Sequence, residues 1–221
     1  MIYSNPNDVC QQFLELVEKL SPNSETYRKL ELEKKLIIEV IQMLSNEHSI
    51  VKHSYYRDED SKIGLVNPFF SDHLTKLIHH INFALWKSKK DQVFSDCLFF
   101  ILKSHCHINL FYRTSIPVYF FPFHALGSVL GRTNYGKYFF IHQNCNVGGN
   151  YTEFPIFGDG VVLGPNTSIL GKCKIGDNVK VGAGTLIIEK DIPDNSIIFG
   201  RPGNYVVSEN KLDNRKIWLD I

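Results

Sequence analysis

The sequence shows almost no excess of either charge. It holds 24 lysines and arginines against 23 aspartates and glutamates, which gives a net charge of +1. A balance this close to zero offers no electrostatic footprint for nucleic acid or for an anionic membrane. We therefore expect neither of them as a partner.

Long apolar runs and a leader peptide are also missing. The longest apolar stretch, around Val93–Leu102, is too short to span a bilayer and contains Asp96. The first residues, Met1–Pro6, lack the basic and apolar regions of a signal peptide. The five cysteines are an odd number with no Cys-x-x-Cys pair, which favours reduced thiols over a disulfide framework. These absences predict a cytoplasmic protein without a membrane span.

Glycine is nearly absent from the first half of the chain. Of 15 glycines only Gly64 precedes residue 127. Apolar residues in this half recur at three- and four-residue spacing, which predicts helices over 8–20, 25–44 and 71–86 and a fourth from Asp91 or Ser95 to about 104. Ser71-Asp72 is the expected cap of the third helix, and 45–68 is expected to be a loop. We assign 1–108 to a helical N-terminal domain.

The second half repeats with a period of six. Large apolar anchors fall six residues apart at Phe157, Leu163, Ile169, Ile175, Val181 and Ile187. This period fits neither an α-helix nor an alternating strand, and a β-sandwich would show turn signals every 8–12 residues. It fits a triangular coil of about 18 residues per turn, in which Leu163 stacks on Val181 and Ile169 on Ile187. The predicted fold class is α+β, with a left-handed parallel β-helix over 109–207 and a tail over 208–221.

Four segments of this half resemble one family. His124-Ala125-Leu126-Gly127, with Gly131, is similar to the His-Ala-Thr-Gly-x-x-x-Gly segment of bacterial serine O-acetyltransferases, which are hexapeptide-repeat acyltransferases. Segments 143–149 and 181–185 resemble that family's Gln-Ser-Val-Thr-Leu-Gly-Gly and Ile-Gly-Ala-Gly-Ser. Asp-Ile-Pro at 191–193 and Gly-Arg-Pro-Gly at 200–203 resemble its closing motif. The resemblance covers 109–207 well.

The resemblance implies an acetyl-CoA-dependent acetyltransferase. The family implies a homotrimer, with acetyl-CoA in the groove between neighbouring β-helices, and such trimers can pair into dimers of trimers. Carried over by position, His124 is the general base. His142 lies 18 residues after His124, one nominal turn, so we expect it to neighbour the site. Backbone at Gly149, Pro165 and Ala183 meets the pantetheine arm, and Lys190 and Arg201 are the candidates for the CoA phosphates. Pro165 stands in place of an alanine and still offers a carbonyl.

These residue types suit acetyl transfer from a thioester to a hydroxyl. The alcohol loses a proton as it attacks, the oxyanion needs donors, and the two substrates need alignment. Imidazole ordinarily titrates near pH 6.5, so it is a suitable base that contributes about 10²–10⁴-fold. The chemistry requires no metal and no covalent intermediate. His105-x-His107 is too weak a pattern for a metal site, and His79-His80 is expected on a helix surface.

Several positions depart from the family's pattern. Asn109 replaces the carboxylate that pairs with the catalytic histidine; its amide can still orient the imidazole. Phe123, Glu153 and Phe154 replace charged residues that bind serine, so no partner for the serine carboxylate is evident. Aromatic residues are frequent here instead, and they either line a sugar site or pack in the core or a trimer interface: Tyr119, Phe120, Phe121, Phe123, Tyr135, Tyr138, Phe139, Phe140, Tyr151 and Phe154.

Three functions therefore remain open from the sequence. The function that we predict is acetylation of a saccharide or polysaccharide precursor, which the aromatic residues and lost charges favour over the two alternatives. The second is serine O-acetylation in cysteine biosynthesis, which the motifs favour. The third is a non-catalytic trimeric scaffold, which Asn109 permits.

Overall fold

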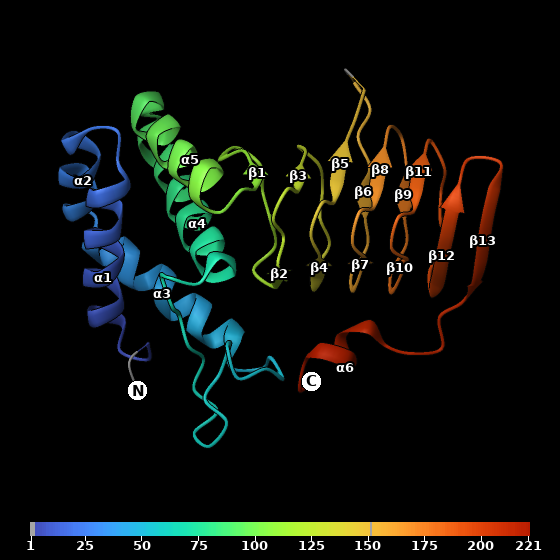
Figure 1. Cartoon of the computed structure of the whole chain (residues 1–221), viewed down its shortest axis with the longest axis horizontal. Coiled ribbons are helices and arrows are strands. Elements are labelled where there is room, and N and C mark those ends of the chain that lie inside the picture. The colour runs from blue at the N-terminus through green and yellow to red at the C-terminus, as the bar shows by residue number, and fades with distance from the viewer. Residues whose placement is uncertain (1–2, 151) are drawn as a thin grey trace. The chain divides into compact units, whose positions relative to one another are not determined.

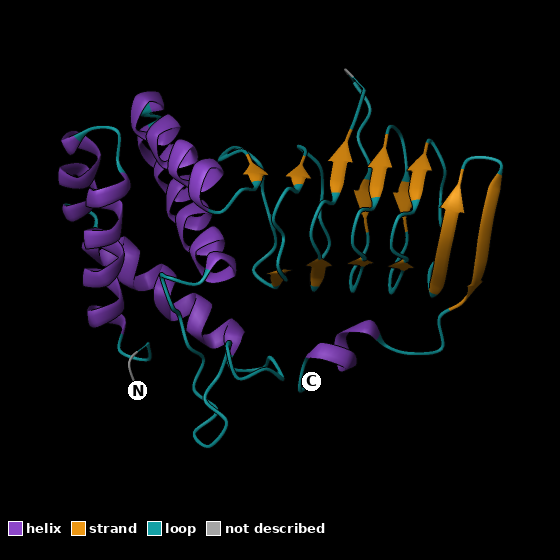
Figure 2. Ribbon diagram, in the orientation of Figure 1, coloured by secondary structure: helices purple, strands orange, loops and turns teal. Residues whose placement is uncertain are grey.

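The protein, seen in a computed structural model that describes residues 3–150 and 152–221, forms two compact units (Figures 1 and 2). One comprises Met1–Cys106 with Trp218–Ile221, and the other His107–Ile217. The first is helical and the second is a parallel β-helix, so the predicted fold class is confirmed. Tyr151, one of the aromatic residues singled out above, lies outside the described residues. No helix within 3–150 or 152–221 is long and apolar enough to cross a bilayer.

The helical unit contains α1 (Pro6–Leu20), α2 (Ser24–Glu31), α3 (Lys34–His48), α4 (Ser71–Lys89) and α5 (Gln92–His105). The predicted single helix over 25–44 is wrong, because the chain breaks between α2 and α3. The segment 31–35 offers one apolar residue, Leu32, and that side chain is 84% exposed. Leu30 and Ile37 on either side are buried, so two short helices bury apolar residues that flank an unfavourable segment.

Side-chain caps explain where three helices begin. Asn5, Asn23 and Asp91 each accept a backbone N–H at the start of α1, α2 and α5. Of the two starts predicted for the fourth helix, Asp91 and Ser95, Asp91 is therefore correct, and this helix is α5. The expected cap at Ser71-Asp72 is wrong: Phe70 stands at the cap position without a side-chain bond. Asp72 is buried instead, and the Tyr56 hydroxyl donates to it at 3.3 Å.

A polar cluster lies buried between α3 and α4. Lys76, 0% exposed, donates to Glu47 at 2.6 Å and to Nε2 of His48 at 3.2 Å. Nδ1–H of His48 donates to the Leu65 carbonyl at 2.7 Å, and Nδ1 of His73 accepts the Asn67 N–H at 3.0 Å. The expected surface position of His79 is also wrong, since His79 is buried on the same helix. These hydrogen bonds offset part of the cost of burying the cluster, while Glu47 Oε2, His73 Nε2 and His79 Nδ1 are buried without a hydrogen bond among the described residues.

The β-helix consists of three rows of strands, all parallel except for a final hairpin. Row 1 holds β1 (Asn109–Leu110), β3 (Val129–Leu130), β5 (Asn146–Gly148), β8 (Ser168–Leu170) and β11 (Leu186–Ile188). Row 2 holds β2 (Phe120–Pro122), β4 (Phe139–Ile141), β7 (Val162–Leu163), β10 (Lys180–Val181), β12 (Ser196–Arg201) and the antiparallel β13 (Asn204–Glu209). Row 3 holds β6 (Ile156–Phe157) and β9 (Lys174–Ile175).

The six-residue period places the anchors inside this coil. Val181 pairs with Leu163, and Ile187 with Ile169, as predicted. All six anchors are buried, and the irregular earlier positions Leu130, Ile141 and Val147 continue the same columns. The hydrophobic pattern thus fixes the register of every coil.

Five of the ten aromatic residues named above lie in the core. Phe120 stacks on Phe139, and Phe121 on Phe140, with ring centroids 6.4 and 5.0 Å apart. Phe120, Phe121, Phe123, Phe139 and Phe140 are all buried. Of the two readings left open above, packing is therefore the correct one for these five, and their faces are closed to a sugar ring.

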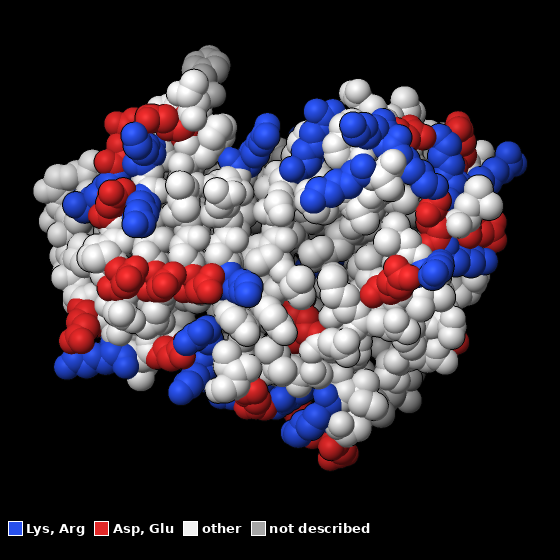
Figure 3. Space-filling model, turned by 180° about the vertical axis from the view of Figure 1, so that it is seen from behind, with Lys and Arg blue, Asp and Glu red and all other residues white. Residues whose placement is uncertain are grey.

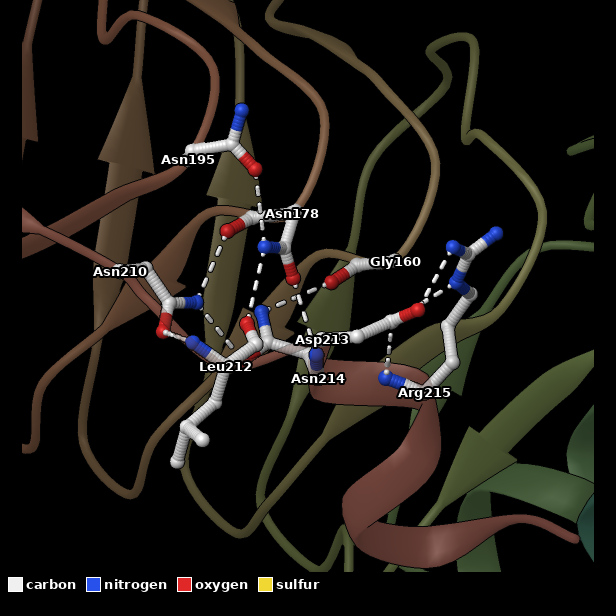
Figure 4. Close-up of polar contacts among 8 residues, drawn as sticks. All are labelled: Gly160, Asn178, Asn195, Asn210, Leu212, Asp213, Asn214 and Arg215. Atoms are coloured by element: carbon white, nitrogen blue, oxygen red, sulfur yellow. Dashed lines mark hydrogen bonds and ion pairs between the residues drawn. The ribbon is translucent and has the colours of Figure 1, made fainter. Parts of the chain in front are cut away.

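After β13 the chain returns along one corner of the β-helix, and asparagine amides hold it there (Figure 4). The Asn178 amide donates to Asn195 and to the Leu212 carbonyl, while its oxygen accepts the Asn214 N–H. The buried Asn214 donates to the Gly160 carbonyl at 2.9 Å. Helix α6 (Asn214–Trp218) follows, and Leu219 ends fully buried in the helical unit, paired with Val51.

Candidate active site

The corners between the strand rows carry the candidate residues. We call the corner from row 2 to row 1 the His124 edge, the corner from row 1 to row 3 the loop edge, and the corner from row 3 to row 2 the tail edge. Some corner residues, such as Cys145, are buried with the anchors, whereas His124 is exposed. A ligand can reach the exposed ones.

His124 is exposed in a left-handed backbone conformation, with φ 51°. In the later coils Asn144, Asn166 and Gly184 hold one left-handed position on this edge, which Gly127 holds in the coil of His124. His124 is thus a second left-handed residue in its corner, and glycine and asparagine adopt this conformation at lower cost. Hydrogen bonds fix the turn: the Gly127 N–H donates to the His107 carbonyl, and the Ser128 hydroxyl to the His142 carbonyl. A histidine held in a costly conformation is typical of a functional position.

His142 lies next to His124, as predicted from the nominal turn length. Burial lowers the pKa of His142, and the nearby His124 and Lys180 lower it further. The ring of Phe123 packs 6.2 Å from that of His142, centroid to centroid. His142 is therefore neutral near pH 7, and no second cation forms beside His124 when His124 takes up a proton.

Pro165 and Ala183 lie on the same edge, one and two coils beyond His142. The Pro165 carbonyl accepts the Gly184 N–H at 2.8 Å, so one of its two lone pairs is already in use. The carbonyl keeps a second lone pair for a ligand. Five candidates thus share the His124 edge: Phe123, His124, His142, Pro165 and Ala183.

Asn109 lies in row 1, where its N–H donates to the Ser128 carbonyl at 2.8 Å. The neighbouring Leu110 points into the core and is buried, so the half-buried Asn109 side chain faces outward. Its predicted bond to the imidazole of His124 stays a prediction.

The loop edge carries the inserted segment between β5 and β6. A Cβ at Gly149 would meet the Glu153 carbonyl and the Phe154 ring within 2.4 Å, so only glycine fits this turn. Asn150 accepts the Glu153 N–H at 2.9 Å, and the Glu153 carboxylate pairs with Lys172 at 3.1 Å. Lys190 lies one coil beyond Lys172, 5.4 Å from the Tyr205 ring, and Arg201 ends β12.

Next to the inserted segment is an open hollow of about 620 Å³. The sequence interpretation missed two of its basic residues, Arg132 and Lys172. They are far apart in the chain, and only the stacking of coils brings both beside Glu153. The 40 residues between them are not a multiple of six, because the inserted segment interrupts the period, so the sequence offered no signal for their proximity.

The predicted site residues are thus divided between two edges of one chain. His124 and its neighbours lie on the His124 edge, whereas Gly149, Glu153, Phe154 and Lys190 lie on the loop edge. Row 1 separates the two edges, so one chain does not gather them around one point.

The tail edge has a different character. The carboxylates of Asp159, Asp177 and Asp194 each accept a backbone N–H from the preceding coil. Figure 3 shows acidic side chains in a row along the β-helix, and otherwise both signs are scattered over that face. In the part of the chain that the structure describes, no three His, Cys, Asp or Glu side chains are grouped as metal ligands would be.

Comparisons with known proteins find similarity to acetyltransferases. The "Bacterial transferase hexapeptide (six repeats)" family matches residues 154–189. A serine acetyltransferase of Bacillus pumilus is 28% identical over 152 residues, which are 63% of this chain and 65% of that protein. A putative acetyltransferase of Bacillus subtilis, YvoF, is 40% identical over 60 residues, 27% of this chain and 34% of its own length. The match to the Bacillus pumilus protein thus spans just under two thirds of its length.

Solved structures share the fold. The serine acetyltransferase of Neisseria gonorrhoeae, crystallised with serine, superposes with a TM-score of 0.68 at 22% identity, covering 88% of this chain and 81% of its own. A soybean serine acetyltransferase superposes with a TM-score of 0.66 at 20% identity, covering 90% and 83%. The helical unit followed by the β-helix is therefore an architecture that serine acetyltransferases also have.

Proposed function

We propose that this chain, a hexapeptide-repeat protein resembling the serine O-acetyltransferase-like branch, is an acetyl-CoA-dependent O-acetyltransferase. The observation that carries the proposal is His124: an exposed imidazole in a left-handed turn, beside a neutral His142, within the segment that resembles the catalytic motif. The similarity to a serine acetyltransferase and to a putative acetyltransferase supports the same activity.

In this reaction His124 removes the proton of the acceptor hydroxyl as its oxygen attacks the thioester carbonyl. The tetrahedral intermediate collapses and expels the CoA thiolate, which takes up that proton. Pro165 and Ala183 meet the pantetheine arm along the His124 edge, Gly149 meets it from the loop edge, and Lys190 and Arg201 bind the phosphates. Asn109 orients the imidazole through its amide.

The divided geometry supports a shared site between copies of the chain. In a ring of parallel β-helices, the His124 edge of one copy faces the loop edge of the next. We propose a homotrimer, as the resemblance implies, in which each site uses both edges. A pairing of two such trimers remains part of this proposal.

L-Serine is the acceptor that the comparisons favour, because the relatives are named serine acetyltransferases. The saccharide acceptor that we expected from the aromatic residues has lost that argument, since five of them are buried in the core. The replaced charges at Phe123 and Phe154 are what still supports it.

The test is release of the CoA thiol from acetyl-CoA across a panel of L-serine, neutral sugars and nucleotide sugars. We expect release with L-serine and its loss, by at least about 10², in His124→Ala. A matched control is His53→Ala, an exposed histidine of the helical unit. No release with any acceptor would favour a non-catalytic scaffold, and release with sugars alone would restore the saccharide acceptor.

A further inference from the structure

The hollow on the loop edge has features that the proposed catalytic steps leave unused. Arg132 and Asn134 line one side of it and Lys172 another, and the inserted segment closes it with Glu153 and Phe154. Its volume of about 620 Å³ is enough for a small organic molecule. Phe154 is 37% exposed, so part of its ring is available to a ligand.

The charges of the hollow do not cancel. Glu153 is paired with Lys172 at 3.1 Å. Among residues 3–150 and 152–221, none forms a hydrogen bond or ion pair with the guanidinium of Arg132. The hollow therefore presents one uncompensated positive charge, in the planar form that binds a carboxylate or a phosphate through two parallel hydrogen bonds.

The position of Arg132 along the β-helix indicates which substrate it meets. The chain passes from β2 through His124 and β3 directly to Arg132, so His124 and Arg132 belong to one coil. Pro165, Ala183, Lys190 and Arg201, the candidates for acetyl-CoA, all lie on later coils. In a ring of parallel β-helices, coils at one level face each other, so Arg132 of one copy stands level with His124 of the next. That level is the acceptor end of the site.

We propose that Arg132 binds the anionic group of the hydroxyl acceptor, a carboxylate or a phosphate, and thereby selects for charged acceptors. The proposal rests on the proposed acetyltransferase function and its shared site. From the sequence alone, no partner for the serine carboxylate was evident. Arg132 would be that partner, and it lies on a neighbouring coil rather than in the inserted segment.

The kinetic test compares acceptors in matched pairs, L-serine with L-serinamide and glucose 1-phosphate with glucose, which separates the carboxylate source from the phosphate source. We expect the charged member of one pair to be preferred. Arg132→Gln should raise its KM at least about 10-fold, since hydrogen bonds to a charged group carry that much affinity. The KM for acetyl-CoA should change less than about twofold. Arg132→Lys should retain part of the preference, and Arg28→Gln, an exposed arginine of α2, should behave as wild type.

A binding measurement separates this inference from the proposed function. Titration calorimetry with L-serine, glucose 1-phosphate and their neutral partners requires no turnover. Binding of a charged ligand that Arg132→Gln abolishes supports the inference even if no acetyl group is transferred. An unchanged acceptor KM in Arg132→Gln, an equal rise in the acetyl-CoA KM, or equal binding of charged and neutral ligands would overturn it.

Discussion

The backbone angle of His124 sets the position of its imidazole before any substrate binds. Gly127 holds the left-handed position that the later coils share on this edge, and His124 adds a second left-handed residue to its coil. A histidine in this conformation costs about 1–3 kcal/mol of strain. Such strain is typical of residues with a catalytic role. A substitution that relieves the strain but removes the imidazole therefore separates a catalytic role from a structural one.

We predict that His124→Asn lowers turnover by at least about 10² while leaving the free energy of unfolding unchanged or raising it by up to about 1 kcal/mol. Asparagine adopts the left-handed conformation readily but is no base. Steady-state kinetics and denaturant unfolding of the same preparation check both parts. A destabilised variant with wild-type turnover would mean that the imidazole serves folding alone.

The contacts and the burial of several single residues could not be predicted from the sequence. Arg132 and Glu153 become neighbours only through coil stacking across an insertion of irregular length, so no local pattern predicts their proximity. His79 was misplaced because helical spacing alone does not reveal the polar cluster that buries it. The sequence does not distinguish a phenylalanine of the core from one that lines a ligand site. Burial in the structure assigns four of them to the core: Phe120, Phe121, Phe139 and Phe140.

Among the elements, α3 and α4 form the polar cluster that links stability to pH. Burial lowers the pKa of His73 to about 3, helped by the charge of Lys76, and lowers that of His48 well below its usual range. Both are neutral in the folded protein, whereas in the unfolded chain they protonate near pH 6.5. Unfolding below pH 6.5 is therefore accompanied by proton uptake at both histidines. As a result, the free energy of unfolding decreases as the pH falls from 6.5 toward 3.

We predict that His73→Asn reduces the pH dependence of the free energy of unfolding below pH 6 by about 1.4 kcal/mol per pH unit. The asparagine oxygen can still accept the Asn67 N–H, which His73 accepts at 3.0 Å. Denaturant unfolding at pH 7, 6 and 5 checks this, with His53→Asn as an exposed control. A slope equal to that of the wild type would contradict the burial of a neutral His73.

The elements of the β-helix were predictable because one physical rule repeats in every coil. Six-residue spacing identified the anchors and their register, and no comparable repeat exists in the helical half. There the break at Leu32 and the cap at Phe70 depend on which side chains are buried, which propensity does not determine.

At the scale of the whole molecule, the chain begins in the helical unit, builds the β-helix and returns its last residues to the helical unit. Leu219 is 0% exposed there, and the Asp220 carboxylate pairs with Arg57 at 2.5 Å. The sequence analysis assigned 208–221 to a tail without naming what it contacts, since nothing local in this segment predicts the partner elements.

We predict that Leu219→Ala lowers the free energy of unfolding by about 2–5 kcal/mol, because it leaves a cavity in a packed core. Backbone amides near its partner Val51 should lose hydrogen-exchange protection first. Leu212→Ala, at a 65% exposed tail position, is the control and should change little. Unaltered exchange near Val51 would mean that the tail adds nothing to the helical unit.

The proposed acetyl transfer depends most on a site that the His124 edge of one copy shares with the loop edge of the next. The direct measurement is acetyl transfer by oligomers co-expressed from two differently tagged chains, His124→Ala and Arg132→Glu, each with little activity alone. With random mixing, about one quarter of the sites pair an intact His124 with an intact Arg132 from the next copy, so activity should recover to about one quarter of wild type. Activity no greater than the average of the two separate variants would contradict the shared site.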